Sequence, residues 1–228
     1  MPSNFFTTTP AWQAAYPGAS AGILAVRGAS NPAAHPELEQ RKQALETALR
    51  DRFAGLGRAE IEALPAVQAY NAYYKPFKKT YHVQLQLESI AFKGKPIPSV
   101  AALVEAMFMA EIKNQMLTAG HDLERLQLPV TLDVAQGTEQ YTLMRGQEQV
   151  LKTGDMFMSD GLGILSSILY GPDQRSQITT ETRNALFTVY APPGIAPETV
   201  QAHLEDLRDN ILLIAPQAEV LALHVFSA

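Results

Sequence analysis

Apolar residues in the first half of the chain recur with the spacing of helices. In residues 37–53, Leu38 and Leu45 fall on one face, and Pro36 stands at the favoured first-turn position. A residue that precedes proline avoids the helical region, so a further helix should end before Pro76. These patterns predict a strand at residues 21–27 and helices at 37–53, 58–64, 65–75 and 82–92.

A fifth helix is predicted from residue 99 to about 115, because Ser99 can cap its start. Its apolar residues fall on most sides rather than on one face, so we expect it in the interior of the protein. The residues concerned are Val100, Leu103, Val104, Met107, Phe108 and Ile112.

The second half of the chain changes to short apolar runs divided by Gly, Asp and Pro, a pattern typical of strands. Pro197 then opens a last helix, and alternating residues close the chain as a strand. The predicted strands are residues 130–134, 141–144, 156–158, 164–170, 185–190 and 219–226, and the last helix is 198–214.

Helices first, then a block of strands, then one helix and one strand indicate an α+β fold. We expect a single domain over residues 1–228, with an N-terminal extension at 1–35 and a C-terminal helix and strand at 196–228. The 46% hydrophobic and 18% charged residues are values of a globular protein. No apolar run approaches the roughly 20 residues of a membrane span. We therefore expect a cytoplasmic protein with no membrane association.

Candidate chemistry is sparse. The chain has no Cys, which excludes disulfides and thiolate catalysis, and it has no standard hydrolase, metalloprotease or nucleotide-binding signature. The five histidines stand singly, so we expect no metal and no cofactor. His203 and His224 lie on predicted apolar faces and should be core residues.

One segment, residues 70–82, interleaves aromatic and basic residues. The predicted RNA-binding residues are Tyr74, Lys75, Lys78 and Lys79, because lysines hold phosphates while aromatic rings stack on bases. In the alternative interpretation, the lysines stabilise a helix end and the tyrosines are packing residues. The net charge of -5 argues against non-specific coating of nucleic acid but allows a local basic patch.

Two carboxylates, Glu105 and Glu111, interrupt the apolar fifth helix. A buried carboxylate is costly without a partner, so each is either part of a structural ion pair, or exposed, or a base or ammonium-binding acid in a pocket. Arg183 is one possible partner for Glu105, although a structural turn is its other role. His121 and Asp122 adjoin in a predicted loop and make only a weak dyad.

The order of these pieces resembles a known domain. Several short segments follow one another with characteristic spacing: residues 66–74, 92–98, the apolar helix 100–115, Gly120-His121-Asp122-Leu123, Thr153-Gly154-Asp155 and residues 180–184. The series is similar to the tRNA-associated B-three/B-four domain of the phenylalanyl-tRNA synthetase β subunit, with the match strongest over residues 58–190. That domain is a three-layer α+β fold with helices on a mostly antiparallel sheet sandwich.

The resemblance implies a function and a site. In the synthetase this domain hydrolyses mischarged tRNA, so it implies tRNA or aminoacyl-tRNA as partner, and a role in translation quality control. Without synthetic modules, the chain is not expected to charge tRNA. Carried over by position, the pocket residues are Met107, Phe108, Ala119, Gln174 and Arg175, and the catalytic candidates are His121 and Glu105.

The chain departs from the family at the reacting positions. Ala119 stands where the synthetase has His, Gln174 where it has Glu, and Met107-Phe108 where it has Thr-Asn. Neither Ala nor Gln can act as a general base. Three hypotheses follow: an aminoacyl-tRNA deacylase acting in trans, a non-catalytic pocket for an amino acid, metabolite or tRNA end, and a partner-binding protein that keeps only the fold.

Overall fold

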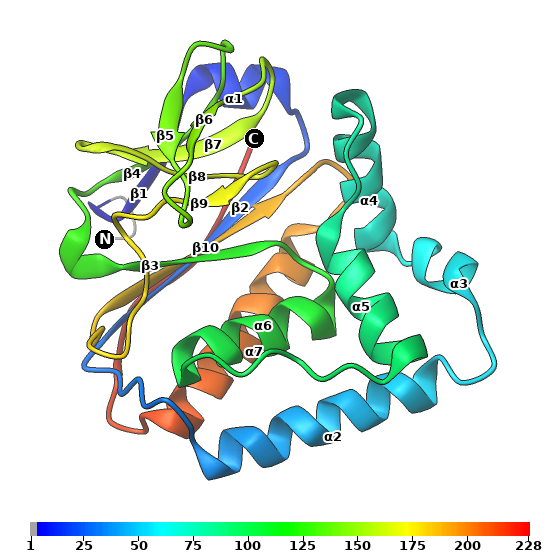
Figure 1. The fold of residues 1–228 in the computed structure, drawn as a ribbon. Coiled ribbons are helices and arrows are strands. Elements are labelled where there is room, and N and C mark those ends of the chain that lie inside the picture. The colour runs from blue at the N-terminus through cyan, green and yellow to red at the C-terminus, as the bar shows by residue number, and fades with distance from the viewer. Residues whose placement is uncertain (1–3) are drawn as a thin grey trace.

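A computed structural model describes residues 4–228 and shows an α+β fold in three layers (Figure 1). A layer of helices covers one face of a four-stranded sheet, and a five-stranded sheet lies against its other face (Figure 1). The predicted fold class, helices on a mostly antiparallel sandwich, is confirmed. No helix within residues 4–228 combines the length and the hydropathy needed to cross a bilayer.

The helices are α1 (Pro10–Ala15), α2 (Pro36–Arg52), α3 (Arg58–Glu62), α4 (Pro65–Tyr74), α5 (His82–Lys93), α6 (Ala102–Asn114) and α7 (Pro197–Ile214), with 3-10 turns at Lys75–Phe77 and Leu123–Arg125. Helices α2 to α7 agree with the predicted ones to within a few residues at each end, and α1 is additional.

The strands form two sheets and a hairpin. Their order is β1-β4-β7-β8-β9 in the first sheet and β11-β2-β10-β3 in the second, and β5 pairs with β6. Only β1 and β4 pair in parallel among these neighbours. The bounds are β1 (Phe6–Thr8), β2 (Ser20–Arg27), β3 (Thr118–Asp122), β4 (Val130–Val134), β5 (Gln140–Thr142), β6 (Glu148–Val150), β7 (Met156–Asp160), β8 (Gly163–Ser167), β9 (Gly171–Pro172), β10 (Ala185–Ala191) and β11 (Glu219–Ser227).

The four-stranded sheet and the helices enclose the main core. β2 is buried along nearly its whole length, and α7 lies directly on it. Gly22 makes this close approach possible, because a Cβ there would come 2.8 Å from Val200 Cγ1. His203 on α7 is fully buried and bonded to Thr118, as predicted, but His224 on β11 is exposed, so its expected place in the core is wrong.

The N-terminal extension holds more structure than the one predicted strand. Phe6–Thr8 adds β1 to the five-stranded sheet, and α1 follows with Trp12 fully buried. The side chain of Thr9 caps α1 by accepting a hydrogen bond from the Trp12 amide at 3.1 Å. Thr9 followed by Pro10 is a helix start of the same kind as the one recognised at Pro36.

Two local predictions around α6 are wrong. The helix begins at Ala102 with no side-chain cap, and Ser99 instead accepts a hydrogen bond from Lys42 Nζ at 2.8 Å. The predicted loop at residues 120–122 is strand β3, which pairs antiparallel with β10. Small and polar residues gave β3 no apolar alternation, so only the pairing with β10 reveals it.

Candidate functional site

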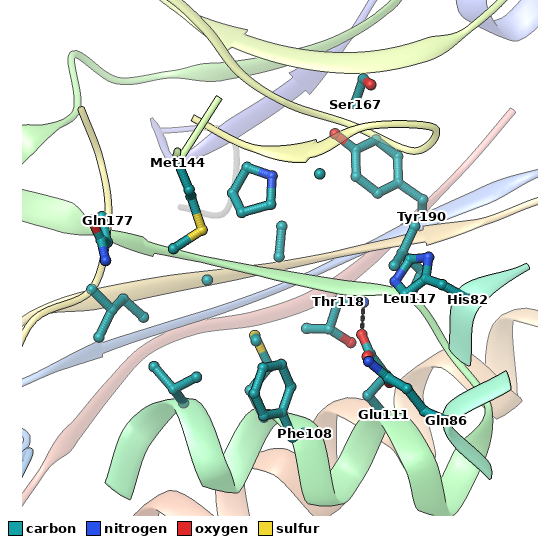
Figure 2. Close-up of a pocket in the computed structure, with 17 residues that line it drawn as sticks. His82, Gln86, Phe108, Glu111, Leu117, Thr118, Met144, Ser167, Gln177 and Tyr190 are labelled. Atoms are coloured by element: carbon teal, nitrogen blue, oxygen red, sulfur yellow. Dashed lines mark hydrogen bonds between the residues drawn. The ribbon is translucent and has the colours of Figure 1, made fainter. Parts of the chain in front are cut away.

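A cavity of about 220 Å³ opens at the free edge of β3 (Figure 2). β3 is the outermost strand of its sheet, so its edge is bordered by α6 on one side and by the segment β8–β9 on the other. The volume lies below the roughly 300–1,000 Å³ of sites for drug-sized ligands. The cavity therefore suits a group of amino-acid size rather than a whole nucleotide.

The walls are mainly apolar. Met107, Phe108 and Ala119 line the cavity, in the position that the sequence analysis gave to the pocket. The other apolar lining residues are Val104, Leu117, Met144, Pro172 and Ile178. Phe108 and Met144 extend into the cavity from opposite sides (Figure 2). An apolar side chain would therefore be favoured as occupant.

Glu111 is the one carboxylate that lines the cavity within residues 4–228. Only 3% of the residue is exposed, and its Oε2 accepts a hydrogen bond from the Thr118 amide at 2.9 Å (Figure 2). Burial raises the pKa of Glu111 to about 8, and the amide of Thr118 lowers it in part. No Lys or Arg of the described chain forms an ion pair with it.

The turn after α6 places this carboxyl. Gln115 adopts a left-handed conformation at the helix end, with φ of 53°, and the chain returns along α6 as β3. The first outward-facing amide of β3, that of Thr118, thereby meets Glu111. The tyrosines behind it donate elsewhere: Tyr70 to the Tyr190 carbonyl, and Tyr81 to the Gln115 carbonyl at 3.0 Å.

The free edge of β3 also turns backbone groups outward. The amide of Thr118 bonds to Glu111, and that of Asp122 bonds to the Ser176 carbonyl, so neither points at β10. Because the direction alternates along a strand, the amide of Gly120 between them points to the same edge. A Cβ at Gly120 would come 2.8 Å from Ile178 Cδ1 and 3.2 Å from Met107 Sδ, so glycine keeps this edge open.

The mouth carries neutral and weakly basic polar groups. His82 and Gln86 of α5 lie near Glu111, and Gln177 lies at the opposite end (Figure 2). His82, Gln86 and Phe108 also line a second hollow, which continues past Lys95 and Pro98. The cavity thus opens into a groove along α5 that can take the remainder of a larger ligand.

Glu105 does not line the cavity, which corrects its assignment as a catalytic candidate. Its Oε2 lies 2.8 Å from Lys42 Nζ of α2, and both side chains are buried. Burial lowers the pKa of Lys42, but hydrogen bonds to Glu105 and Glu39 outweigh this and leave it raised. Arg183, the partner considered from the sequence, instead donates to the carbonyls of Thr180 and Thr182, so it stabilises a turn.

His121 is also outside the cavity. Successive residues of a strand face opposite sides, so its ring lies opposite Gly120 and is fully buried. Its Nδ1 lies 2.7 Å from Ser176 Oγ. Burial, with a contribution from Arg175, lowers the pKa of His121 to about 4. The ring is therefore neutral and turned away from any ligand at the β3 edge.

Gln174 and Arg175 line a different hollow, together with β5 and the start of β8. Arg175 is held by Asp160, with Nη2 and Oδ1 2.8 Å apart, and it donates to the Arg125 carbonyl at 2.6 Å. Gln174 is exposed. Their placement beside Met107 and Phe108 is therefore wrong, and the late-loop residues that do reach the cavity are Gln177 and Ile178.

The basic segment keeps its lysines at the surface but not its tyrosine. Tyr74 is only 2% exposed and cannot stack on a base. Lys75 and Lys78 are exposed. Lys79 lies 4.1 Å from the centroid of the Tyr170 ring, in the stretch that leads from β8 to the cavity wall at β9.

Within residues 4–228 no cluster of three or more His, Asp or Glu side chains has the arrangement of a metal site. Glu111 is the charged lining residue that the resemblance did not place in the pocket. It was recognised from the sequence as a costly carboxylate, and its position four residues after Met107 places it about one turn further along α6.

Comparisons with known proteins indicate the fold only. No family model and no curated protein matches the chain. A solved structure that is similar is an N-terminal fragment of the phenylalanyl-tRNA synthetase β-subunit from Pyrococcus horikoshii, with 12% identity and a TM-score of 0.51. The match covers 95% of this chain and 50% of the fragment, so the chain spans about half of the fragment's length.

Proposed function

We propose that this protein is a tRNA-related domain that hydrolyses the ester of mischarged aminoacyl-tRNA in trans. The fold shared with the synthetase β-subunit fragment supports the relation to tRNA. The observation that carries the proposal is the cavity beside α6 and β3, whose size and apolar walls suit an aminoacyl group. We further propose equivalence to the editing domain of the synthetase, on the sequence motifs described above.

The aminoacyl group enters with its side chain between Phe108 and Ile178, and its ester lies toward the mouth. The terminal nucleotide is too large for the cavity and occupies the adjoining groove along α5. Lys75, Lys78 and Lys79 provide positive charge on the preceding segment for the phosphates. This placement assigns specificity to the cavity and affinity to the surface.

The reaction needs little from the side chains. Water attacks the ester carbonyl carbon, the bond from that carbon to the ribose oxygen breaks, and the products are an amino acid and a free tRNA hydroxyl. The amide of Gly120 points to the open edge and can donate to the developing oxyanion. Because Ala119 and Gln174 supply no base, positioning and the tRNA's own hydroxyl carry the remaining chemistry.

The test is release of amino acid from a panel of aminoacyl-tRNAs, correctly charged and mischarged. We expect hydrolysis above background for at least one mischarged species. Val104→Trp, which fills the cavity, should abolish it, whereas Val100→Trp, at a residue 55% exposed just before α6, should not. Background rates across the panel, or equal activity of the two variants, would contradict the proposal.

A second candidate is a binding module without catalysis. Ala119 at the family's His position favours it, as does the place of Gln174 in a different hollow. Under this hypothesis the same cavity holds an amino acid or the aminoacyl end and releases it unchanged. Thermal stabilisation by such ligands, with no hydrolysis of any aminoacyl-tRNA, would support it over the deacylase.

A further inference from the structure

We infer that the cavity selects a ligand with a free ammonium group and a blocked carboxyl group, and that Glu111 binds the ammonium. The ligand class is an α-amino ester or amide, which includes the aminoacyl group. The inference rests on the proposed function for the identity of the natural ligand, but not for the chemistry of recognition.

The side chain of Glu111 has unfilled capacity to accept hydrogen bonds. A carboxylate accepts about four hydrogen bonds, and in the described part of the chain its side chain receives one, from the Thr118 amide. The neighbouring hydroxyls of Tyr70 and Tyr81 donate to backbone carbonyls. Gln86 on α5 offers only a neutral amide, and His82 is exposed at the mouth. A cation is what this site lacks.

Among the described residues, the lining of the cavity carries one acidic side chain but no strongly basic one. Of the residues around the cavity, Glu111 is the one carboxylate and none is Lys or Arg. A ligand ammonium would therefore find a partner, whereas a ligand carboxylate would lie near Glu111 with no counter-charge. An ester or amide removes that repulsion. The free amino acid, which is the product of hydrolysis, should bind more weakly and leave.

The wall of the cavity around Glu111 is apolar. Phe108 and Leu117 exclude water around Glu111, so an ion pair formed there is screened much less than one at the surface. The same wall makes the carboxylate unfavourable when the cavity holds no cation. Binding an ammonium thus relieves a cost that already exists in the free protein.

The experiment is calorimetric titration of the full chain with L-alaninamide, L-leucinamide and L-phenylalaninamide at about pH 7.8, close to the ordinary pKa of an α-amino group, so that a large share of each amide still carries its ammonium. The comparison ligands are the N-acetyl amides and the free amino acids with the same side chains. We expect at least one amide to bind, with its N-acetyl form and its free acid at least tenfold weaker. Glu111→Gln should weaken the amide at least tenfold, whereas Glu62→Gln, a surface control, should leave binding unchanged.

Failure is distinct from failure of the proposed function. If no amide binds, or if an N-acetyl amide binds as tightly as its parent, the inference is overturned whatever the hydrolysis assay shows. This comparison uses only the unaltered protein, so it does not depend on the folding of any variant. Amide binding that needs Glu111, together with no deacylation, would retain the inference and remove the deacylase.

Discussion

Two carboxylates stand six residues apart on α6, and their surroundings differ in one respect. Glu105 is 5% exposed and Glu111 is 3% exposed, so both are buried. Glu105 has Lys42 Nζ at 2.8 Å and the Val100 amide at 3.0 Å. Among residues 4–228, the side chain of Glu111 has the Thr118 amide alone as a hydrogen-bond partner, and a cavity lies beside it.

The difference separates a structural acid from a candidate binding acid. A buried charge is tolerated when a partner compensates it, and Lys42 does this for Glu105. Nothing comparable serves Glu111, whose pKa is raised to about 8 by burial. A buried acid with a perturbed pKa and no paired cation, next to an open cavity, is common at functional sites. Substitutions that remove the partner of one carboxylate, or the charge of the other, test this difference.

The largest effect should come from breaking the paired member. Lys42→Met leaves Glu105 buried without its cation, and we expect the free energy of unfolding to fall by about 3–5 kcal/mol. Urea denaturation measures it. Adding Glu105→Leu to Lys42→Met should recover most of the loss, since neither charge then remains unpaired. A change below about 1 kcal/mol in the single variant would contradict a structural role for the pair.

Neutralising the unpaired member should have the opposite sign. Folding raises the pKa of Glu111, so its stabilising contribution is fully present below the ordinary pKa and is lost as pH rises through about 8. Glu111→Gln removes this loss. We expect the variant to be about 1–3 kcal/mol more stable than the native protein at pH 9, and nearly equal to it at pH 4.

The measurement is the free energy of unfolding of both proteins from pH 4 to pH 9. Desolvation lowers the pKa of His82, but His82 is present in both proteins, so its titration cancels in the difference between them. A gap between variant and native protein that is the same at pH 4 and pH 9 would show that Glu111 is not the buried, unpaired acid described here.

A change at Gly120 should affect the surroundings of Glu111 and leave those of Glu105 alone. Gly120→Ala places a methyl group 2.8 Å from Ile178 Cδ1, so we expect a loss of about 1–2 kcal/mol on unfolding. The added carbon also narrows the cavity and should weaken binding of amino amides. Unchanged affinity in the titration above would place the ligand elsewhere.

The smallest effect on stability should come from the basic segment, which touches neither carboxylate. Reversing the charges of Lys75, Lys78 and Lys79 should change the free energy of unfolding by about 1 kcal/mol or less. Binding of tRNA should weaken, and its dependence on the logarithm of salt should fall by about 2. Amino-amide binding should persist. Filter binding at several salt concentrations tests the first two outcomes.

Apolar spacing and starting prolines predicted the helices α2 to α7, but the short helix α1 was not predicted. Periodicity also missed β3, whose Thr, Ala, Gly and His carry no apolar alternation, and whose strand geometry comes from pairing with β10. The candidate site was likewise predicted only in part. Met107, Phe108 and Ala119 line the cavity, and their role as a substrate pocket stays a prediction.

Glu105 and Glu111 could not be separated from the sequence, because the difference is made by residues distant along the chain. Lys42 lies 63 positions before Glu105. His121 was also predicted to lie in a loop, where no strand alternation fixes the direction of its ring. Strand alternation, once β3 is recognised, turns that ring away from the cavity.

The most direct test of the account is a pH titration of Glu111 itself, monitored by the NMR signal of its labelled carboxyl carbon. The titration is done without a ligand and with L-leucinamide or another amide that binds. We predict a pKa near 8 in the free protein. It should fall by at least about 2 units when the amide is bound, because the ammonium stabilises the carboxylate. A pKa near the ordinary value in the free protein, or one that the N-acetyl amide lowers equally, would contradict the account.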